Sequence, residues 1–350
     1  MRLKWSFVIG LTLIMILGIG QHSKAQQTYN ITDLGTLPGS NSSEATGINA
    51  SGQVSGTSSD TVADIDHCFI WTSGSGLVDL GNIAGFDSCG ATAINSLGQS
   101  SGEVYNALGP SHAVLWTAGP GLTDIHSSSF TSSESTGINS ATQIVGYLFN
   151  TRPVHAFLWR SDVGMMDLGT MSGLPSSSAA GINDAGQVVG SSWDDTTGNT
   201  RAFLWTAGAG FTDLGTLPGF IYAEAAAINA SGQVVGEASN DTGPAHGVVW
   251  NTTPGTMTDL GTLSGFLSLH PQAINSSGVV VGEASNDDPL NPVFHAFVWQ
   301  NGTISDLNTL IPGGSGWVLL RATGINDNGQ IVGNGTIGGQ THAFLLTPTI

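Results

Sequence analysis

Short apolar runs separated by Gly-, Asn- and Ser-rich turns fill this chain from Ile31 onward. In one well-formed unit the runs cover residues 226–229, 233–236, 246–250 and 257–260, and similar units recur about every 46 residues. The runs lack strict alternation of apolar and polar residues, as expected for strands that are covered on both faces. Four short strands in a unit of this length are typical of a β-propeller blade.

The clearest marker of the repeat is an Asn that follows the first strand of each unit. It occurs seven times, at Asn49, Asn95, Asn139, Asn183, Asn229, Asn275 and Asn326. An Asn there can accept hydrogen bonds from backbone amides two residues on, and a Gly three residues later suits the left-handed conformation of a hairpin turn. Thr142 takes the place of that Gly in the third unit. The sequence therefore predicts an all-β, seven-bladed propeller of four-stranded antiparallel blades.

The two ends of the repeat region complement one another. Residues 29–34 read as a lone fourth strand, and residues 342–346 read as a third strand without its partner. We expect the N-terminal strand to complete the last blade and close the ring, which removes exposed strand edges. The alternative is an open β-solenoid, which would not need complementary ends.

Several residue types occupy one position in nearly every unit, and we interpret them as structural. Their even spacing around a ring keeps them too far apart to share a metal ion. We expect the histidines to bond the Asp of the Asp-Leu-Gly segment or a turn carbonyl, the aspartates to accept from turn amides, and the tryptophans to pack between blades. The histidines are His67, His112, His155, His246, His295 and His342, and the aspartates are Asp33, Asp79, Asp124, Asp167, Asp213, Asp259 and Asp306.

The N-terminus carries a different pattern. Arg2 and Lys4 precede an apolar run over residues 5–19, and a small-residue site ends at Ala25. This arrangement predicts a cleavable signal peptide over residues 1–25, followed by one seven-repeat domain over residues 26–350 that is secreted or held at the cell surface. The mature chain would contain no transmembrane segment.

Removal of the signal peptide makes the charge balance more extreme. All 25 acidic residues stay, whereas only four arginines and no lysine remain of the seven basic residues. An acidic surface of this kind repels phosphate backbones, so nucleic acid is not an expected partner. The loss of lysine also excludes Schiff-base chemistry.

Cys68 and Cys89 are the two cysteines of the chain. An even number of cysteines in an exported protein favours a disulfide, and we predict one between them.

The motif His-Ala-Phe occurs at residues 155–157, 295–297 and 342–344. In this motif the chain resembles the bacterial HAF extracellular repeat family, over essentially the whole predicted mature chain. The resemblance implies export and a repeat architecture, and it carries no assigned activity. Arg201 departs from the motif, where it stands in place of the His in the fourth unit.

Function is expected where the repeat is broken. In a propeller the links between second and third strands and between blades emerge on one face, so long variable segments gather there. Carboxylates and amides suit calcium, and aromatic rings beside them suit sugars. We predict a binding site for a polysaccharide or a protein, with calcium as the one cofactor to consider. Its residues would be Trp193, Asp194, Asp195, Asp241, Asp287, Asp288 and Trp317.

Two other function classes compete with this binding module. A pair of loop carboxylates could act as acid and base in a polysaccharide hydrolase or lyase. A purely structural protein of the cell surface or matrix would need no ligand at all. No residue pattern designates a catalytic site, and we expect the chain to act as a monomeric binding module.

Overall fold

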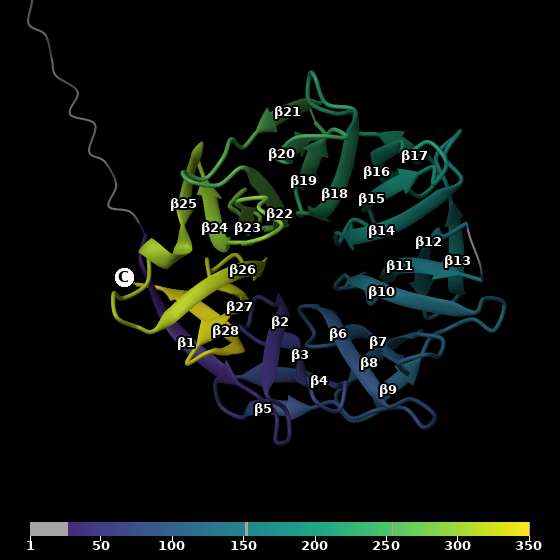
Figure 1. The fold of residues 1–350 in the computed structure, drawn as a ribbon. Coiled ribbons are helices and arrows are strands. Elements are labelled where there is room, and N and C mark those ends of the chain that lie inside the picture. Colours follow the sequence, from purple (N-terminus) through teal and green to yellow (C-terminus); the bar gives the residue numbers. More distant parts are fainter. Residues whose placement is uncertain (1–26, 151–152, 254, 350) are drawn as a thin grey trace, which may run out of the picture.

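The computed structural model describes residues 27–150, 153–253 and 255–349, so the predicted signal peptide lies outside the described residues. Within these residues, 28 strands form seven four-stranded antiparallel sheets. The sheets are arranged as blades around a central axis (Figure 1). The predicted seven-bladed propeller is confirmed, and the open solenoid is wrong.

The first strand of each blade lies innermost (Figure 1), and successive first strands are neighbours around the axis. These inner strands are β2 (Ser42–Ile48), β6 (Ser88–Ile94), β10 (Ser132–Ile138), β14 (Ser176–Ile182), β18 (Tyr222–Ile228), β22 (Ser268–Ile274) and β26 (Trp317–Ile325). The second strands are β3 (Val54–Asp60), β7 (Ser100–Tyr105), β11 (Ile144–Phe149), β15 (Val188–Trp193), β19 (Gln233–Ser239), β23 (Val280–Ser285) and β27 (Ile331–Ile337).

The outer half of each blade completes the sheet. The third strands are β4 (Ile65–Thr72), β8 (His112–Thr117), β12 (His155–Arg160), β16 (Thr200–Thr206), β20 (His246–Asn251), β24 (Phe294–Gln300) and β28 (Gln340–Pro348). The fourth strands are β5 (Gly76–Asp79), β9 (Gly121–Asp124), β13 (Gly164–Gly169), β17 (Gly210–Asp213), β21 (Thr256–Asp259), β25 (Thr303–Asp306) and β1 (Tyr29–Gly35). A single turn of 3-10 helix, η1 (Leu307–Thr309), follows β25.

The N-terminal strand closes the ring as predicted. Strand β1 pairs antiparallel with β28, from Tyr29 opposite Pro348 to Gly35 opposite Ala343, and so becomes the fourth strand of the seventh blade. Tyr29 and Leu34 bury their side chains there. Figure 1 shows the purple first strand beside the yellow last strand.

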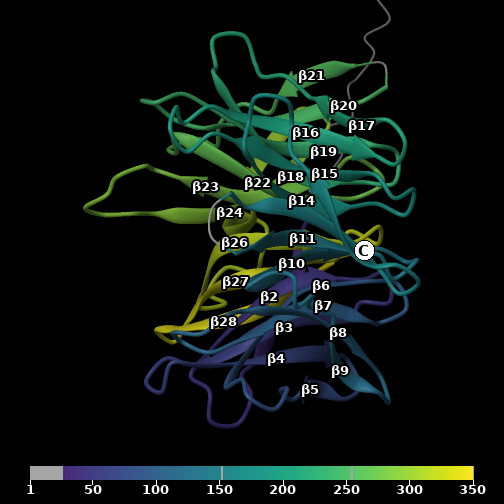
Figure 2. The same cartoon turned by 90° about the vertical axis from the view of Figure 1, so that its right-hand side faces the viewer.

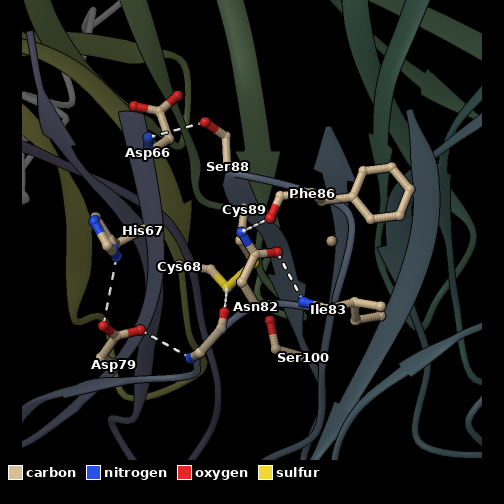
Figure 3. The surroundings of a disulfide bond; sticks show 12 residues. Asp66, His67, Cys68, Asp79, Asn82, Ile83, Phe86, Ser88, Cys89 and Ser100 are labelled. Atoms are coloured by element: carbon tan, nitrogen blue, oxygen red, sulfur yellow. Dashed lines mark hydrogen bonds and ion pairs between the residues drawn. A yellow bond between two sulfur atoms is a disulfide. The ribbon is translucent and has the colours of Figure 1, made fainter. Parts of the chain in front are cut away.

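A disulfide between Cys68 on β4 and Cys89 on β6 is present as predicted. It joins the first blade to the second (Figure 3), and both cysteines are buried among apolar residues of that interface. The bond spans 21 residues, so by chain entropy alone it could contribute about 3 kcal/mol to stability.

The Gly of each second strand is required by close packing. A Cβ built on Gly190 would lie 2.0 Å from the carbonyl oxygen of Ser178 on the paired inner strand, and the other six blades show the same conflict at 1.9–2.3 Å. The inner strand bulges at this point, where its register to the second strand shifts by one residue. This packing explains why the Gln-Val-Val-Gly segment keeps its Gly.

The repeated Asn lies at the end of the inner strand and is buried in all seven blades. In the fourth blade, Asn183 Oδ1 accepts from the amides of Ala185 and Gln187, both at 3.1 Å, as the sequence predicts for the first of them. Its Nδ2 donates to the backbone oxygen of Asn229 in the next blade at 3.1 Å. Thr142, with φ 59°, adopts the left-handed conformation that Gly provides in the other turns.

The link from each Asn to the next closes on itself. Every repeat Asn donates to the backbone oxygen of the next one at 3.0–3.2 Å, and Asn326 donates to Asn49. We call this cycle the Asn ring. It surrounds the axis at the end of the inner strands, opposite the face on which the blade-to-blade links emerge.

Candidate functional site at the channel mouth

The repeated histidines and aspartates bond to each other, which confirms the structural interpretation. In five blades the imidazole Nδ1 lies 2.7–3.0 Å from the Asp of the same blade, and in the first blade His67 lies 3.5 Å from Asp79. Arg201 takes over the role in the fourth blade, 3.8 Å from Asp213. Each of the seven aspartates also accepts from the amide two residues on at 2.7–2.8 Å. Figure 3 shows the His67–Asp79 pair next to the disulfide.

The predicted ligand residues of the fourth blade hold their own loop together. Trp193, the last residue of β15, donates its indole N–H to Asp195 at 3.1 Å. Asp194 accepts from the hydroxyl and the amide of Thr196 and from the hydroxyl of Thr197. These hydrogen bonds lower the pKa of Asp194, which is how a loop-capping carboxylate behaves.

The predicted acidic residues of the fifth and sixth blades also bond close to their own loops. Asp241 accepts from the Tyr222 hydroxyl at 2.5 Å, which raises the pKa of that tyrosine. Asp287 accepts from the Ser268 hydroxyl at 2.5 Å. Asp288 accepts from two backbone amides of the β23–β24 connection, and these bonds lower its pKa. This connection projects from one face of the molecule (Figure 2).

Trp317, the last of the predicted ligand residues, begins β26 and packs edge-on against Phe344, with ring centroids 6.1 Å apart. It contributes to the apolar core of the seventh blade. The predicted residues thus belong to four different blades, and their ligand-binding role stays a prediction.

No group of three or more His, Cys, Asp or Glu side chains is arranged to hold a metal ion in the part of the chain that the structure describes. The suggestion of calcium in the loops therefore stays a prediction without such a cluster to support it. Among the same residues, no helix has the length and apolar character needed to cross a membrane.

A different set of residues breaks the repeat at the loop-rich end of the inner strands. Two positions in each blade, five residues before and eight residues after the repeat Asn, face each other across the first two strands. We call these 14 residues the mouth positions. Blade by blade they are Glu44 and Thr57, Gly90 and Glu103, Glu134 and Tyr147, Ser178 and Ser191, Glu224 and Glu237, His270 and Glu283, and Arg321 and Asn334.

The mouth positions also connect neighbouring blades. His270 Nδ1 donates to Glu237 of the preceding blade at 2.5 Å. Arg321 Nε donates to Glu283 of the preceding blade at 2.8 Å. Asn334 likewise donates to Glu44 of the first blade at 3.3 Å, so the partners differ from one interface to another.

Blades five to seven line an open cavity of about 290 Å³ at these positions. Its walls carry Glu224, Glu237, His270, Glu283 and Arg321, together with Pro271, Gln272 and nearby backbone. Because the mouth positions lie near the start of the inner strands, the cavity lies at the loop-rich end of these strands, which we call the channel mouth. It combines three carboxylates with an imidazole, a guanidinium and an amide.

The ionisable groups of this cavity shift one another's pKa values. The hydrogen bond to Glu237 raises the pKa of His270. Glu283 is only 8% exposed, and its hydrogen bond with Arg321 raises the pKa of Arg321. Partial loss of hydration, and then the charge of Glu237, raise the pKa of Glu224, although the side chain as a whole stays exposed at the channel mouth.

Blades one to three carry a different arrangement at the same positions. Glu103 faces Glu134 of the next blade, and burial, followed by the charges of Glu134 and Asp66, raises the pKa of Glu103 to about 7. Tyr147 donates to Glu134, and Tyr105 donates to Asp66. The pKa of each tyrosine is raised by burial and then by its carboxylate partner.

The prediction of a site in the variable loops did not include these residues, which lie in strands. Glu237 and Glu283 lie in the strands β19 and β23 and were not among the predicted ligand residues. Glu224, His270 and Arg321 lie in inner strands and were not predicted to bind a ligand. A comparison of the seven units shows that these two positions vary, because each holds Glu in three units and four other residue types in the remaining units.

Comparisons with known proteins support the fold and no specific function. No family model matches the sequence, and no curated protein is significantly similar to it. Among solved structures, a streptogramin B lyase covers 92% of this chain and 98% of its own, at 10% identity and a TM-score of 0.56. The virginiamycin B lyase of Staphylococcus aureus is similar at 10% identity and a TM-score of 0.57, covering 92% of this chain and 99% of its own.

A third structure, the β-propeller domain of the Trilobed protease of Pyrococcus furiosus, covers 88% of this chain and 94% of its own, at 9% identity and a TM-score of 0.53. At such low identities the likeness concerns the propeller fold alone. The resemblance to the HAF repeat family therefore stays a resemblance.

Proposed function

We propose that this protein is an exported binding module for a neutral carbohydrate, and that the cavity of blades five to seven is the binding site. The observation that carries the proposal is the composition of the cavity wall. Hydrogen-bond donors and acceptors alternate along it, from Glu237 through His270 and Glu283 to Arg321. Sugar hydroxyls donate and accept at once, so they match a wall of this kind.

Enough hydrogen-bonding capacity remains for a ligand. His270 uses Nδ1 for Glu237 and keeps Nε2, and Arg321 uses Nε for Glu283 and keeps its two terminal nitrogens. The bonds within the wall hold the side chains of His270 and Arg321 in place before a ligand binds. Pre-organisation of this kind reduces the entropy that binding costs.

Charge and export fit the same proposal. The predicted mature chain combines 25 acidic residues with four arginines, which disfavours anionic polymers and leaves neutral sugars as the better class. The disulfide is typical of proteins outside the cytoplasm, and the resemblance to HAF repeats points the same way.

A glycan and polysaccharide array, probed with residues 26–350 in calcium and again in chelator, tests the proposal. We expect binding of neutral glycans in both conditions and a loss of at least about tenfold in affinity for His270→Gln, since a hydrogen bond to a charged group is worth about 1.5–3 kcal/mol. Ser191→Ala changes a mouth position outside the cavity and serves as the matched control.

Three outcomes would contradict parts of this proposal. Loss of binding in chelator would show that binding depends on calcium and would favour a site at the acidic loops. Binding that His270→Gln leaves unchanged would place it elsewhere on the molecule. Silence of the folded protein on all arrays would favour a protein partner or a structural role.

A further inference from the structure

We propose that the same cavity hydrolyses glycosidic bonds with retention of configuration, with Glu224 as the general acid and base and Glu237 as the nucleophile. This inference rests on the proposed carbohydrate binding and adds a reaction to it. It starts from the position of the two carboxylates rather than from their number.

Glu224 on β18 and Glu237 on β19 are direct cross-strand partners. Side chains directly opposite each other in an antiparallel pair leave the same face of the sheet, with Cβ atoms about 4.5–5.5 Å apart. Retaining glycosidases hold their two carboxyl groups about 5–5.5 Å apart, and inverting enzymes need about 6.5–9.5 Å. Each carboxyl carbon lies two bonds beyond its Cβ, so this register brings the two carboxyl groups within reach of the retaining separation.

The direct pairing of two carboxylates at the mouth positions distinguishes the fifth blade. Across the seven pairs of mouth positions, all of which lie in the described residues, two carboxylates stand directly opposite each other only in the fifth blade. That pair also lines the cavity of about 290 Å³, which leaves space for a sugar ring next to both groups.

The two carboxylates differ in their hydrogen bonding, and this difference assigns their roles. Glu237 accepts a hydrogen bond from His270 Nδ1 at 2.5 Å, which orients its carboxylate as a nucleophile. The carboxyl of Glu224 has no hydrogen-bond partner among the described residues, and its raised pKa favours the protonated form that an acid needs.

The reaction balances with water as the second substrate. In the first step an oxygen of Glu237 bonds to the anomeric carbon while the bond from that carbon to the leaving oxygen breaks, and the Glu224 proton moves to the leaving oxygen. In the second step Glu224 takes a proton from water, the water oxygen bonds to the anomeric carbon, and the ester to Glu237 breaks. Both carboxyl groups return to their first states.

The experiment incubates residues 26–350 with neutral polysaccharides and with aryl glycosides, and measures new reducing ends and released phenol. We expect turnover that Glu237→Gln lowers at least about a thousandfold. Glu224→Gln should lose as much on polysaccharides and less on dinitrophenyl glycosides, whose leaving group needs no proton. Glu134→Gln changes a carboxylate at a mouth position of the third blade and serves as the matched control. Circular dichroism confirms that each variant is folded.

A 2-deoxy-2-fluoro glycoside with an activated leaving group provides a second measurement. We expect it to attach to the peptide that contains Glu237, visible as a mass increase, and not to attach to the Glu237→Gln protein. Products that retain the anomeric configuration, followed by NMR, are expected from the parent.

The two proposals can fail separately. Sugar binding without hydrolysis or labelling overturns this inference and leaves the binding module intact. Hydrolysis that persists in folded Glu237→Gln, or products of inverted configuration, also overturns it. Absence of both binding and hydrolysis overturns both proposals.

Discussion

The inner two strands of each blade have two ends along the propeller axis, and these ends differ in whether their residues repeat from blade to blade. At one end the Asn ring repeats a single contact seven times, with the amide of each Asn bonded to the next blade at 3.0–3.2 Å. At the other end no two pairs of mouth positions are alike. Positions that close the ring are the same in every blade, and positions that can meet a ligand are free to differ.

A physical reason underlies this contrast. A ring of seven blades closes only if the rotation between neighbouring blades is the same at every interface. A contact that sets this rotation therefore has to be the same at all seven interfaces. A ligand at the channel mouth touches only a few blades and imposes no such equality. The comparison leads to three predictions, which begin with the largest effect.

Replacement of one Asn in the ring should cost the most stability. Asn183→Ala removes two bonds from turn amides, one bond to Gln187 and the bond to the next blade, all from a residue that is 5% exposed. With about 1 kcal/mol for each net hydrogen bond, the loss of these four bonds should lower the free energy of unfolding by about 4 kcal/mol. Denaturant unfolding measures it.

Asn328→Ala is the matched control for this prediction. Asn328 also bonds to a neighbouring blade, through its amide and the Ala50 oxygen, but it does so once and at the exposed surface. We expect a loss of no more than about 0.5–1 kcal/mol. Equal losses for the two variants would show that the ring contributes no more than any surface contact.

The carboxyl pair of blades two and three should make stability depend on pH. Because the pKa of Glu103 is raised to about 7 in the folded protein, the folded state holds a proton that the unfolded chain releases near pH 4.5. The free energy of unfolding should therefore fall as the pH rises from about 4.5 to about 7, by about 2 kcal/mol after allowance for partial exposure.

Glu103→Gln should remove this fall and make the protein more stable than the parent at pH 8. Ser191→Ala, at the same mouth position of the fourth blade, should keep the slope of the parent. Thermal unfolding across pH 4–8 gives the comparison. A slope that Glu103→Gln does not change would mean that another group near Glu134, Asp66, Tyr105 or Tyr147 holds the proton.

The sequence was sufficient for the fold because the signals for it are local and repeated. Strand runs, the Asn turn, the complementary ends and the two cysteines each predicted a feature that the structure contains. The pairing of repeated His and Asp also follows from position, since their two strands are neighbours within each blade. The second role of the Asn, as a donor to the next blade, was not predicted.

The candidate site was harder to predict because its contacts cross from blade to blade. Glu237 and His270 are 33 residues apart, and Glu283 and Arg321 are 38 apart. Nothing in the local pattern shows which residue of one unit meets which residue of the next until the radial arrangement of blades is known. The search for loops instead selected acidic residues such as Asp194 and Asp288, which accept hydrogen bonds within their own turns.

The smallest effect on stability is expected from substitutions in the β23–β24 connection. These substitutions distinguish ligand binding at the predicted loop site from binding at the channel mouth. Asp287 has a φ of 53°, a conformation that Asn tolerates better than Ala, so Asp287→Asn tests its charge without straining the backbone. Combined with Asp288→Ala, it should lower the melting temperature by no more than about 2 °C. If the ligand binds at the loops, this double variant should lose affinity while His270→Gln keeps it. If the ligand binds in the cavity, as proposed, the order reverses, and calorimetric titration of both variants with the same glycan distinguishes the two sites.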